Sequence, residues 1–209
     1  MERPEHYNQP KDVTNWTWPD VIENWTWPGF EGKPTHVEVY SDADQVELLI
    51  NGTSQGRKTV GEDMPYKAVF DVCYQPGEVT AVAYQEGQET GRTTLTTAGT
   101  AAGVALKAEQ STARADGMSL IYLDISLVDR DGALVRCQDR QITLSVEGDA
   151  RLLGFGSADP KSLEKFNATS HATFDGQALA VLTADHPGRV TVTASADGLA
   201  DGVCQLEFI

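Results

Sequence analysis

The sequence of 209 residues is poor in positive charge, with 16 Lys and Arg against 31 Asp and Glu and a net charge of −15. A surface that binds nucleic acid or an anionic membrane needs an excess of cations, so the composition argues against both partners. No apolar run approaches the roughly 18 residues of a membrane span. Residues 1–6 are polar and lack the apolar core of a signal peptide.

Cysteine is scarce as well, and Cys73, Cys137 and Cys204 are far apart and form no Cys-x-x-Cys motif. Three cysteines cannot all pair within one chain, so we expect neither a disulfide framework nor a zinc site. The simplest interpretation is three free, buried thiols, which favours a reducing compartment such as the cytoplasm. The four histidines show no ligand spacing either, and we expect no metal and no cofactor.

What the sequence does contain, from Thr35 onward, is short runs in which apolar and polar residues alternate. Val46, Leu48 and Ile50 form one such run, and Asn51-Gly52 then supplies the residues that a tight hairpin turn prefers. No window has the period of an amphipathic helix. Many short strands with turns about every 8–12 residues predict an all-β protein with two immunoglobulin-like β-sandwich domains in tandem, preceded by a Trp-rich extended arm.

The composition changes along the chain suggest where these parts begin and end. We expect an extended arm over residues 1–33, a first sandwich over 34–98, a linker of small residues over 99–103 and a second sandwich over 104–209. Residues 154–165 are predicted to form a long loop within the second sandwich.

The arm holds all four tryptophans of the chain, because Asn-Trp-Thr-Trp-Pro occurs twice, at 15–19 and 24–28. In extended backbone, residues two apart point the same way, so each pair can form a flat aromatic strip of the kind that stacks on a sugar ring. The favoured alternative is that the rings bury against a catalytic barrel or against the first sandwich. A contact between copies of the chain is a third hypothesis. The candidate contact residues are Trp16, Trp18, Trp25 and Trp27.

Three stretches of the sequence carry a resemblance to a known family. Asn-Trp-Thr-Trp-Pro-Gly-Phe-Glu-Gly-Lys-Pro at 24–34 is followed by Val-Glu-Leu-Leu-Ile-Asn-Gly at 46–52, and the second half carries Gly-Phe-Gly-Ser-Ala-Asp-Pro at 154–160. These residues resemble the region after the catalytic barrel of bacterial glycoside hydrolase family 2 enzymes of the β-galactosidase type. The resemblance implies a non-catalytic C-terminal region that braces the barrel or shapes its rim or a subunit interface.

The chemistry of such an enzyme is not expected in this chain. A TIM barrel needs roughly 200 residues or more of alternating strand and helix, and a retaining glycosidase needs two carboxyl groups held together in a cleft. No motif singles out such a pair, so we predict no catalytic residue. Asp129-Arg130-Asp131-Gly132 is interpreted as a turn rather than a calcium loop, and Gly154-Phe155-Gly156 as a loop rather than a phosphate site.

Three hypotheses for function therefore stand side by side. The leading one is the accessory region of a glycosidase, with the catalytic barrel as its partner and with a glycan or a second copy as further partners. The second is a carbohydrate-binding module that uses the Trp-rich arm. The third, ranked last because the two halves share no sequence repeat, is a surface adhesion array.

Overall fold

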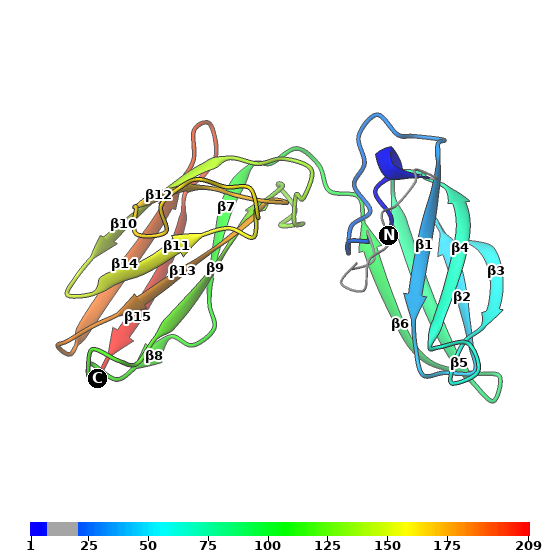
Figure 1. Cartoon of the computed structure of the whole chain (residues 1–209), viewed down its shortest axis with the longest axis horizontal. Helices are drawn as coiled ribbons and strands as arrows, with labels where there is room; N and C mark the ends of the chain where they lie inside the picture. Colours follow the sequence, from blue (N-terminus) through cyan, green and yellow to red (C-terminus); the bar gives the residue numbers. More distant parts are fainter. Residues whose placement is uncertain (8–20) are drawn as a thin grey trace. The chain divides into compact units, whose positions relative to one another are not determined.

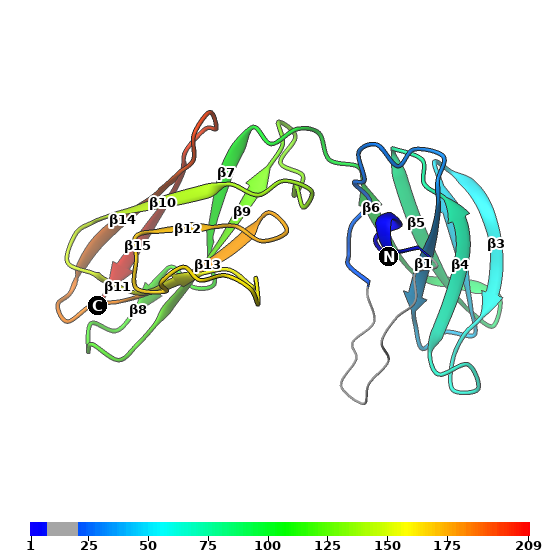
Figure 2. The ribbon, with the colours of Figure 1, turned by 45° about the horizontal axis from the view of Figure 1, so that its top comes forward.

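The computed structural model describes residues 1–7 and 21–209, and its chain divides into two compact units, residues 1–97 and 98–209. Each unit is a pair of facing β-layers (Figures 1 and 2). Among the described residues the helical structure is one 3-10 turn, Pro4–His6. The predicted all-β class is thus confirmed. No helix in the described ranges is long and apolar enough to cross a membrane.

Unit 1 consists of a two-stranded and a four-stranded antiparallel sheet. The small sheet pairs β1 (Pro34–Tyr40) with β4 (Lys67–Cys73). The large sheet has the order β3-β2-β5-β6, from β2 (Gln45–Ile50), β3 (Thr53–Thr59), β5 (Glu78–Gln85) and β6 (Gln88–Thr96).

The core of unit 1 follows from the alternation in its strands. Val46, Leu48 and Ile50 are buried on one face of β2, and they share a core cluster with Val37 of β1 and Phe70 of β4. The hairpin between β2 and β3 turns at Asn51 and Gly52, whose φ angles are 48° and 78°, as the Asn-Gly pair predicts.

Residues 24–33, the end of the predicted arm, pack against the strands of unit 1. Residues 24–33 form no strand, yet Trp25 and Trp27 lie in the same core cluster as β1, β2 and β4. Thr97 Oγ1 donates a hydrogen bond of 2.6 Å to the carbonyl oxygen of Trp25, and the Tyr74 hydroxyl accepts one of 3.2 Å from the Trp27 N–H. Of the two packing partners predicted for the tryptophans, the structure shows the first sandwich for Trp25 and Trp27.

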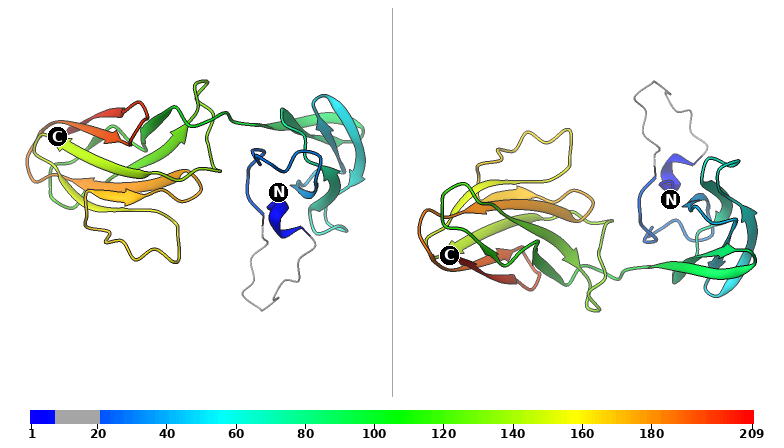
Figure 3. Two further views of the ribbon diagram at one scale, coloured as in Figure 1. Left: turned by 90° about the horizontal axis from the view of Figure 1, so that it is seen from above. Right: turned by 90° about the horizontal axis from the view of Figure 1, so that it is seen from below.

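Unit 2 is a larger sandwich whose two sheets have the orders β12-β10-β14-β15-β8 and β11-β13-β9-β7 (Figure 3). One layer is built from β8 (Thr112–Ala113), β10 (Gln141–Glu147), β12 (Ser170–Ala172), β14 (Gly188–Ser195) and β15 (Gly202–Phe208). The other contains β7 (Gly103–Ala108), β9 (Ile121–Val128), β11 (Arg151–Gly156) and β13 (Gln177–Thr183).

The stretch expected to be a linker, residues 99–103, belongs to unit 2. Ala101 is buried in the core of that unit, and Gly103 begins β7. The Gly99 N–H donates a hydrogen bond of 2.7 Å to Asp129 Oδ2. Small residues therefore mark close packing against the sandwich here, and the boundary between the units falls after Thr97.

The expectation that all three thiols are buried is wrong. All three cysteines are free, as predicted, but Cys73 and Cys137 are exposed and Cys204 is half-buried. The strand period explains Cys73, because Phe70 and Val72 point into the core and the next residue of β4 must point out.

The turn at residues 129–133 is held by the side chain of Asp129. Oδ1 accepts hydrogen bonds of 2.9 Å from the N–H groups of Asp131 and Ala133, while Oδ2 accepts that of Gly99. These donors, the Gly99 N–H first, hold the pKa of Asp129 below its ordinary value of 3.8. Backbone N–H groups occupy the carboxylate, which agrees with a turn rather than a calcium loop.

We expect Asp129→Asn to lower the free energy of unfolding of unit 2 by about 1 kcal/mol at neutral pH, because an amide offers one acceptor oxygen in place of two. A carboxylate with a lowered pKa contributes stability above its ordinary value and loses it as the pH falls through the lowered value. The difference between wild type and variant should therefore shrink below about pH 3.8. Urea unfolding at neutral and acid pH measures it. Asp131→Asn, which removes the same charge two residues away, is the control, and an equal loss there would contradict the assignment.

Candidate functional site

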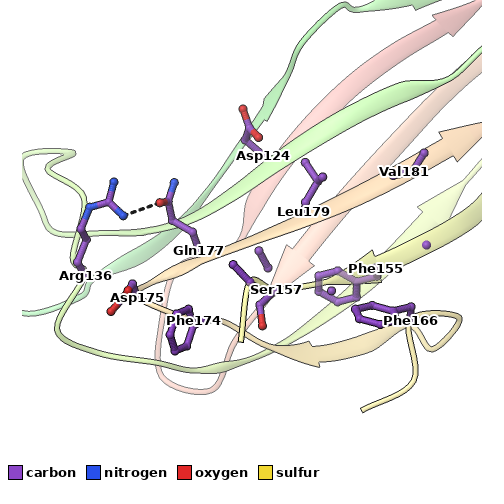
Figure 4. Close-up of a pocket in the computed structure, with 14 residues that line it drawn as sticks. Asp124, Arg136, Phe155, Ser157, Phe166, Phe174, Asp175, Gln177, Leu179 and Val181 are labelled. Atoms are coloured by element: carbon purple, nitrogen blue, oxygen red, sulfur yellow. Dashed lines mark hydrogen bonds between the residues drawn. The ribbon is translucent and has the colours of Figure 1, made fainter. Parts of the chain in front are cut away.

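A groove of about 720 Å³ lies on the outer face of the β11-β13-β9-β7 sheet of unit 2 (Figure 4). Its volume is in the range of sites for small molecules. The groove combines aromatic, aliphatic and polar side chains with two glycines, drawn from Asp124, Arg136, Gly154, Phe155, Gly156, Ser157, Ala158, Phe166, Phe174, Asp175, Gln177, Ala178, Leu179 and Val181.

Strand register builds the floor of the groove. Leu179 of β13 pairs with Asp124 of β9 on one side and with Gly156 of β11 on the other, and Val181 pairs with Gly154. Phe155 between the glycines is buried in the core of the unit. Because Gly154 and Gly156 carry no side chains, β11 leaves the outer face open next to Leu179, which is 41% exposed.

Phe166 forms one wall, and its backbone is fixed to β11. The Phe155 N–H donates a hydrogen bond of 2.7 Å to the Phe166 carbonyl oxygen. The Phe166 ring stacks on the ring of His171 at 5.8 Å between centroids and an angle of 14°. A Cβ atom at Gly156 would lie 2.4 Å from the Phe166 ring, so this ring position requires glycine there. The ring is nonetheless 63% exposed.

The loop that carries Phe166 is tied down by Glu164. Its Oε2 accepts a hydrogen bond of 3.0 Å from the Ala172 N–H, and its Oε1 accepts one of 3.0 Å from Gln141 Nε2. These donors, the Ala172 N–H first, hold the pKa of Glu164 below its ordinary range. The buried His171 lies beside the same carboxylate, with Nδ1 3.2 Å from Oε2. The loop is therefore held in place by Glu164, two residues before Phe166.

The opposite wall comes from the turn between β12 and β13 and from the loop that carries Arg136. Arg136 Nη1 donates a hydrogen bond of 2.7 Å to Gln177 Oε1 (Figure 4). Asp175 and Gly176 turn the chain with φ angles of 51° and 71°, and the Gly176 N–H donates to Asp139 Oδ1. Phe174 lies at the start of this turn, and Figure 4 shows it on the other side of Ser157 from Phe166.

The two carboxyl groups that line the groove, those of Asp124 and Asp175, lie apart from each other. A retaining glycosidase places two carboxyl groups about 5–5.5 Å apart, facing one bond of the sugar. In Figure 4, Asp124 and Asp175 lie on opposite sides of the Arg136–Gln177 pair and do not face each other. In residues 1–7 and 21–209, no group of three or more His, Cys, Asp or Glu side chains could hold a metal ion.

Two of the candidate tryptophans, Trp25 and Trp27, lie elsewhere, in the core of unit 1. Trp25 and Trp27 are only 1% and 6% exposed, and neither indole N–H has a hydrogen-bond partner in the structure. They form no open strip for a sugar, because core packing holds both rings. Trp16 and Trp18 lie outside the described residues.

Sequence reasoning did not find the groove. Its residues come from five separate stretches between 124 and 181, and no motif joins them. Gly154-Phe155-Gly156 was expected to open a loop, but it ends the strand β11. Two glycines around an inward-facing phenylalanine were the available signal for an open patch on the outer face of a sheet.

Both halves of the chain match known families. Residues 104–205 match the model of the glycoside hydrolase family 2 C-terminal domain 5. Residues 32–91 match a domain of unknown function, DUF4982.

Individual relatives agree with the family models. A β-galactosidase of Bacteroides ovatus, BoGH2A, is 32% identical over 80% of this chain and 20% of its own length. A putative β-glucuronidase of Formosa agariphila is 26% identical over 80% of this chain and 15% of its own length. The chain thus spans about a fifth of the length of these curated relatives.

Solved structures show the same relationship. A glycosyl hydrolase family 2 member from Bacteroides cellulosilyticus is 36% identical, with a TM-score of 0.88 over 95% of this chain and 26% of its own. A β-glycosidase from Bacteroides vulgatus is 26% identical, with a TM-score of 0.82 over 89% of this chain and 24% of its own. With both units aligned to such enzymes in sequence and in fold, the chain belongs to the C-terminal accessory region of glycoside hydrolase family 2.

Proposed function

We propose that the chain is a non-catalytic part of a glycoside hydrolase of the β-galactosidase type and that it braces the catalytic barrel of that enzyme. The observation that carries the proposal is that the chain matches only 20%, 15% and 26% of the length of the larger proteins to which it is similar. The first reason for a structural role is that the described residues form two β-sandwiches whose groove lacks a facing pair of carboxylates.

A surface on unit 1 supports contact with a further domain. Tyr40, Met64 and Tyr66 are 57%, 48% and 49% exposed. The Ser41 N–H donates to the Tyr66 carbonyl oxygen, which brings the end of β1 beside the loop before β4. We call these three side chains the Tyr40–Met64–Tyr66 surface. Large apolar side chains that gather on a surface commonly mark a contact with another domain or protein.

The proposed β-galactosidase type has one more support, because BoGH2A is the relative with 32% identity, against 26% for the putative β-glucuronidase. Assays of the longer gene product with nitrophenyl β-galactoside and nitrophenyl β-glucuronide distinguish the two activities. Faster turnover of the glucuronide would contradict the galactosidase type.

The 209-residue chain alone is expected to hydrolyse neither nitrophenyl β-galactoside nor nitrophenyl β-glucuronide. The physical reason is that hydrolysis needs an acid and a nucleophile on either side of one glycosidic bond. The measurement is release of nitrophenol by purified chain, with a mock purification to exclude a contaminating enzyme. Turnover that follows the chain through purification would contradict the proposal.

The bracing role is tested in the longer gene product, made with and without residues 1–209. Removal should lower the Tm of the catalytic part, and Tyr66→Lys should reproduce part of that loss because a charge at a closed apolar contact is costly. Tyr122→Lys, on the outer face of unit 2, is the matched control. An unchanged Tm on removal of residues 1–209 would overturn the proposal.

A further inference from the structure

We propose that the groove on the outer face of the β11-β13-β9-β7 sheet binds a neutral saccharide. Nothing in the bracing role needs this site, so the two proposals stand on separate observations. The groove combines aromatic rings, polar side chains and more carboxylates than cations, and each of these features favours such a ligand.

Phe166 and Phe174 are the aromatic walls of the groove. The C–H groups on one face of a pyranose ring form an apolar patch, and they are attracted to the electron-rich face of an aromatic ring. The Phe166 ring is stacked on His171 and lies close to Gly156, while the side chain as a whole stays 63% exposed. Phe166 thus offers a ring that is already fixed in position, so little rotamer entropy is lost when a ligand stacks on it.

The polar side chains of the groove recognise the hydroxyl groups of the ligand. Sugar hydroxyls both donate and accept, and planar side chains such as carboxylates, amides and guanidinium groups match pairs of them. Asp124 supplies acceptors, and Gln177 and Arg136 supply donors that their mutual hydrogen bond holds in place. Ser157 also lines the groove, although its Oγ is buried and is not itself open to a ligand in this structure.

The charges around the groove favour a neutral ligand over an anionic one. Two carboxylates, Asp124 and Asp175, line the groove against one cation, Arg136, whose guanidinium already bonds Gln177. The whole chain carries a net charge of −15, so an anionic ligand meets repulsion at short and long range. Neutral hexoses and pentoses therefore fit the groove better than uronic acids.

The size of the groove sets the length of the ligand. A volume of about 720 Å³ is more than one sugar ring requires, and Phe174 and Phe166 lie on either side of Ser157 (Figure 4). Two separated rings suit two or more sugar units of one chain. The proposed ligand is thus a neutral oligosaccharide that lies along the groove.

The experiment is calorimetric titration of the 209-residue chain with galactotetraose, cellotetraose and, as the anionic comparison, tetragalacturonic acid. At least one neutral tetrasaccharide should bind at millimolar or lower concentration and bind more tightly than the anionic one. Phe166→Ala should weaken that binding by about tenfold or more. Leu163→Ala is the matched control, because Leu163 is 99% exposed on the same loop and does not line the groove.

A second pair of variants tests the position of the ring rather than its presence. Gly156→Ala places a Cβ 2.4 Å from the Phe166 ring and should weaken binding, whereas Gly154→Ala meets only the Phe166 carbonyl oxygen at 3.9 Å. Circular dichroism checks that all variants fold. No binding of either neutral probe, tighter binding of the anionic one, or equal effects of Phe166→Ala and Leu163→Ala would overturn the proposal. Because the titration uses the chain without a barrel, its failure leaves the bracing role untouched.

Discussion

Trp25→Ala is expected to lower the free energy of unfolding of unit 1 by about 4 kcal/mol, the range for removal of a buried tryptophan from a core. Trp25 is 1% exposed, and its ring and that of Tyr74 form a T-shaped pair with 5.0 Å between centroids and an angle of 79°. The substitution removes this contact and opens a cavity between the N-terminal segment and the strands of unit 1. The tryptophan acts here as core although it lies before the first strand.

Hydrogen exchange read by mass spectrometry separates the two units, which a global unfolding curve does not. Faster exchange is expected in β1, β2 and β4 of unit 1 and no change in β9 and β13 of unit 2. Tyr40→Ala, which removes an aromatic ring that is 57% exposed in the same unit, should change stability by less than about 0.5 kcal/mol. Unchanged protection of unit 1 in Trp25→Ala would show that the segment is dispensable for its core.

Gly176→Ala should have a comparable effect on unit 2, a loss of about 3 kcal/mol or more. Gly176 has a φ of +71°, and an added Cβ would lie 2.1 Å from the Val135 carbonyl oxygen, a backbone atom that cannot move away alone. Gly198 is a matched control with a φ of +72° and nothing within 4 Å of the added Cβ.

Gly198→Ala should lose only the cost of the left-handed backbone, about 1–2 kcal/mol. The difference between the two variants then isolates the clash with Val135 from the strain of the dihedral angle. Urea unfolding of each variant, with hydrogen exchange to assign the transition to unit 2, gives both numbers. Equal losses in the two variants would mean that the loop at Val135 moves freely.

The sequence predicts the β-strands wherever one face of a strand is buried. Val46, Leu48 and Ile50 occupy every second position of β2 and are buried, and Asn51-Gly52 favours a tight turn, so the hairpin is encoded locally. Strand β3, Thr53–Thr59, is different because all seven of its residues are exposed and none is apolar apart from Gly56. It is a strand because it pairs with β2, and no period in its sequence predicts it.

The candidate site shows the same division more sharply. The sequence places Gly154, Phe155 and Gly156 in one stretch, but strand register sets them beside Leu179, and Leu179 in turn beside Asp124. The sequence likewise repeats Asn-Trp-Thr-Trp-Pro without saying which surface covers the rings. The structure places Trp25 and Trp27 in the core of unit 1.

By itself, then, the sequence determined the β class, the hairpin turns and the family, because each depends on residues that are neighbours along the chain. Only the tertiary structure decided that the N-terminal segment completes unit 1 and that a groove exists on unit 2. Both depend on which residues far apart in the sequence lie side by side, as Gly156 and Phe166 do. Long-range sheet register and core packing set that proximity, and neither leaves a period in the sequence.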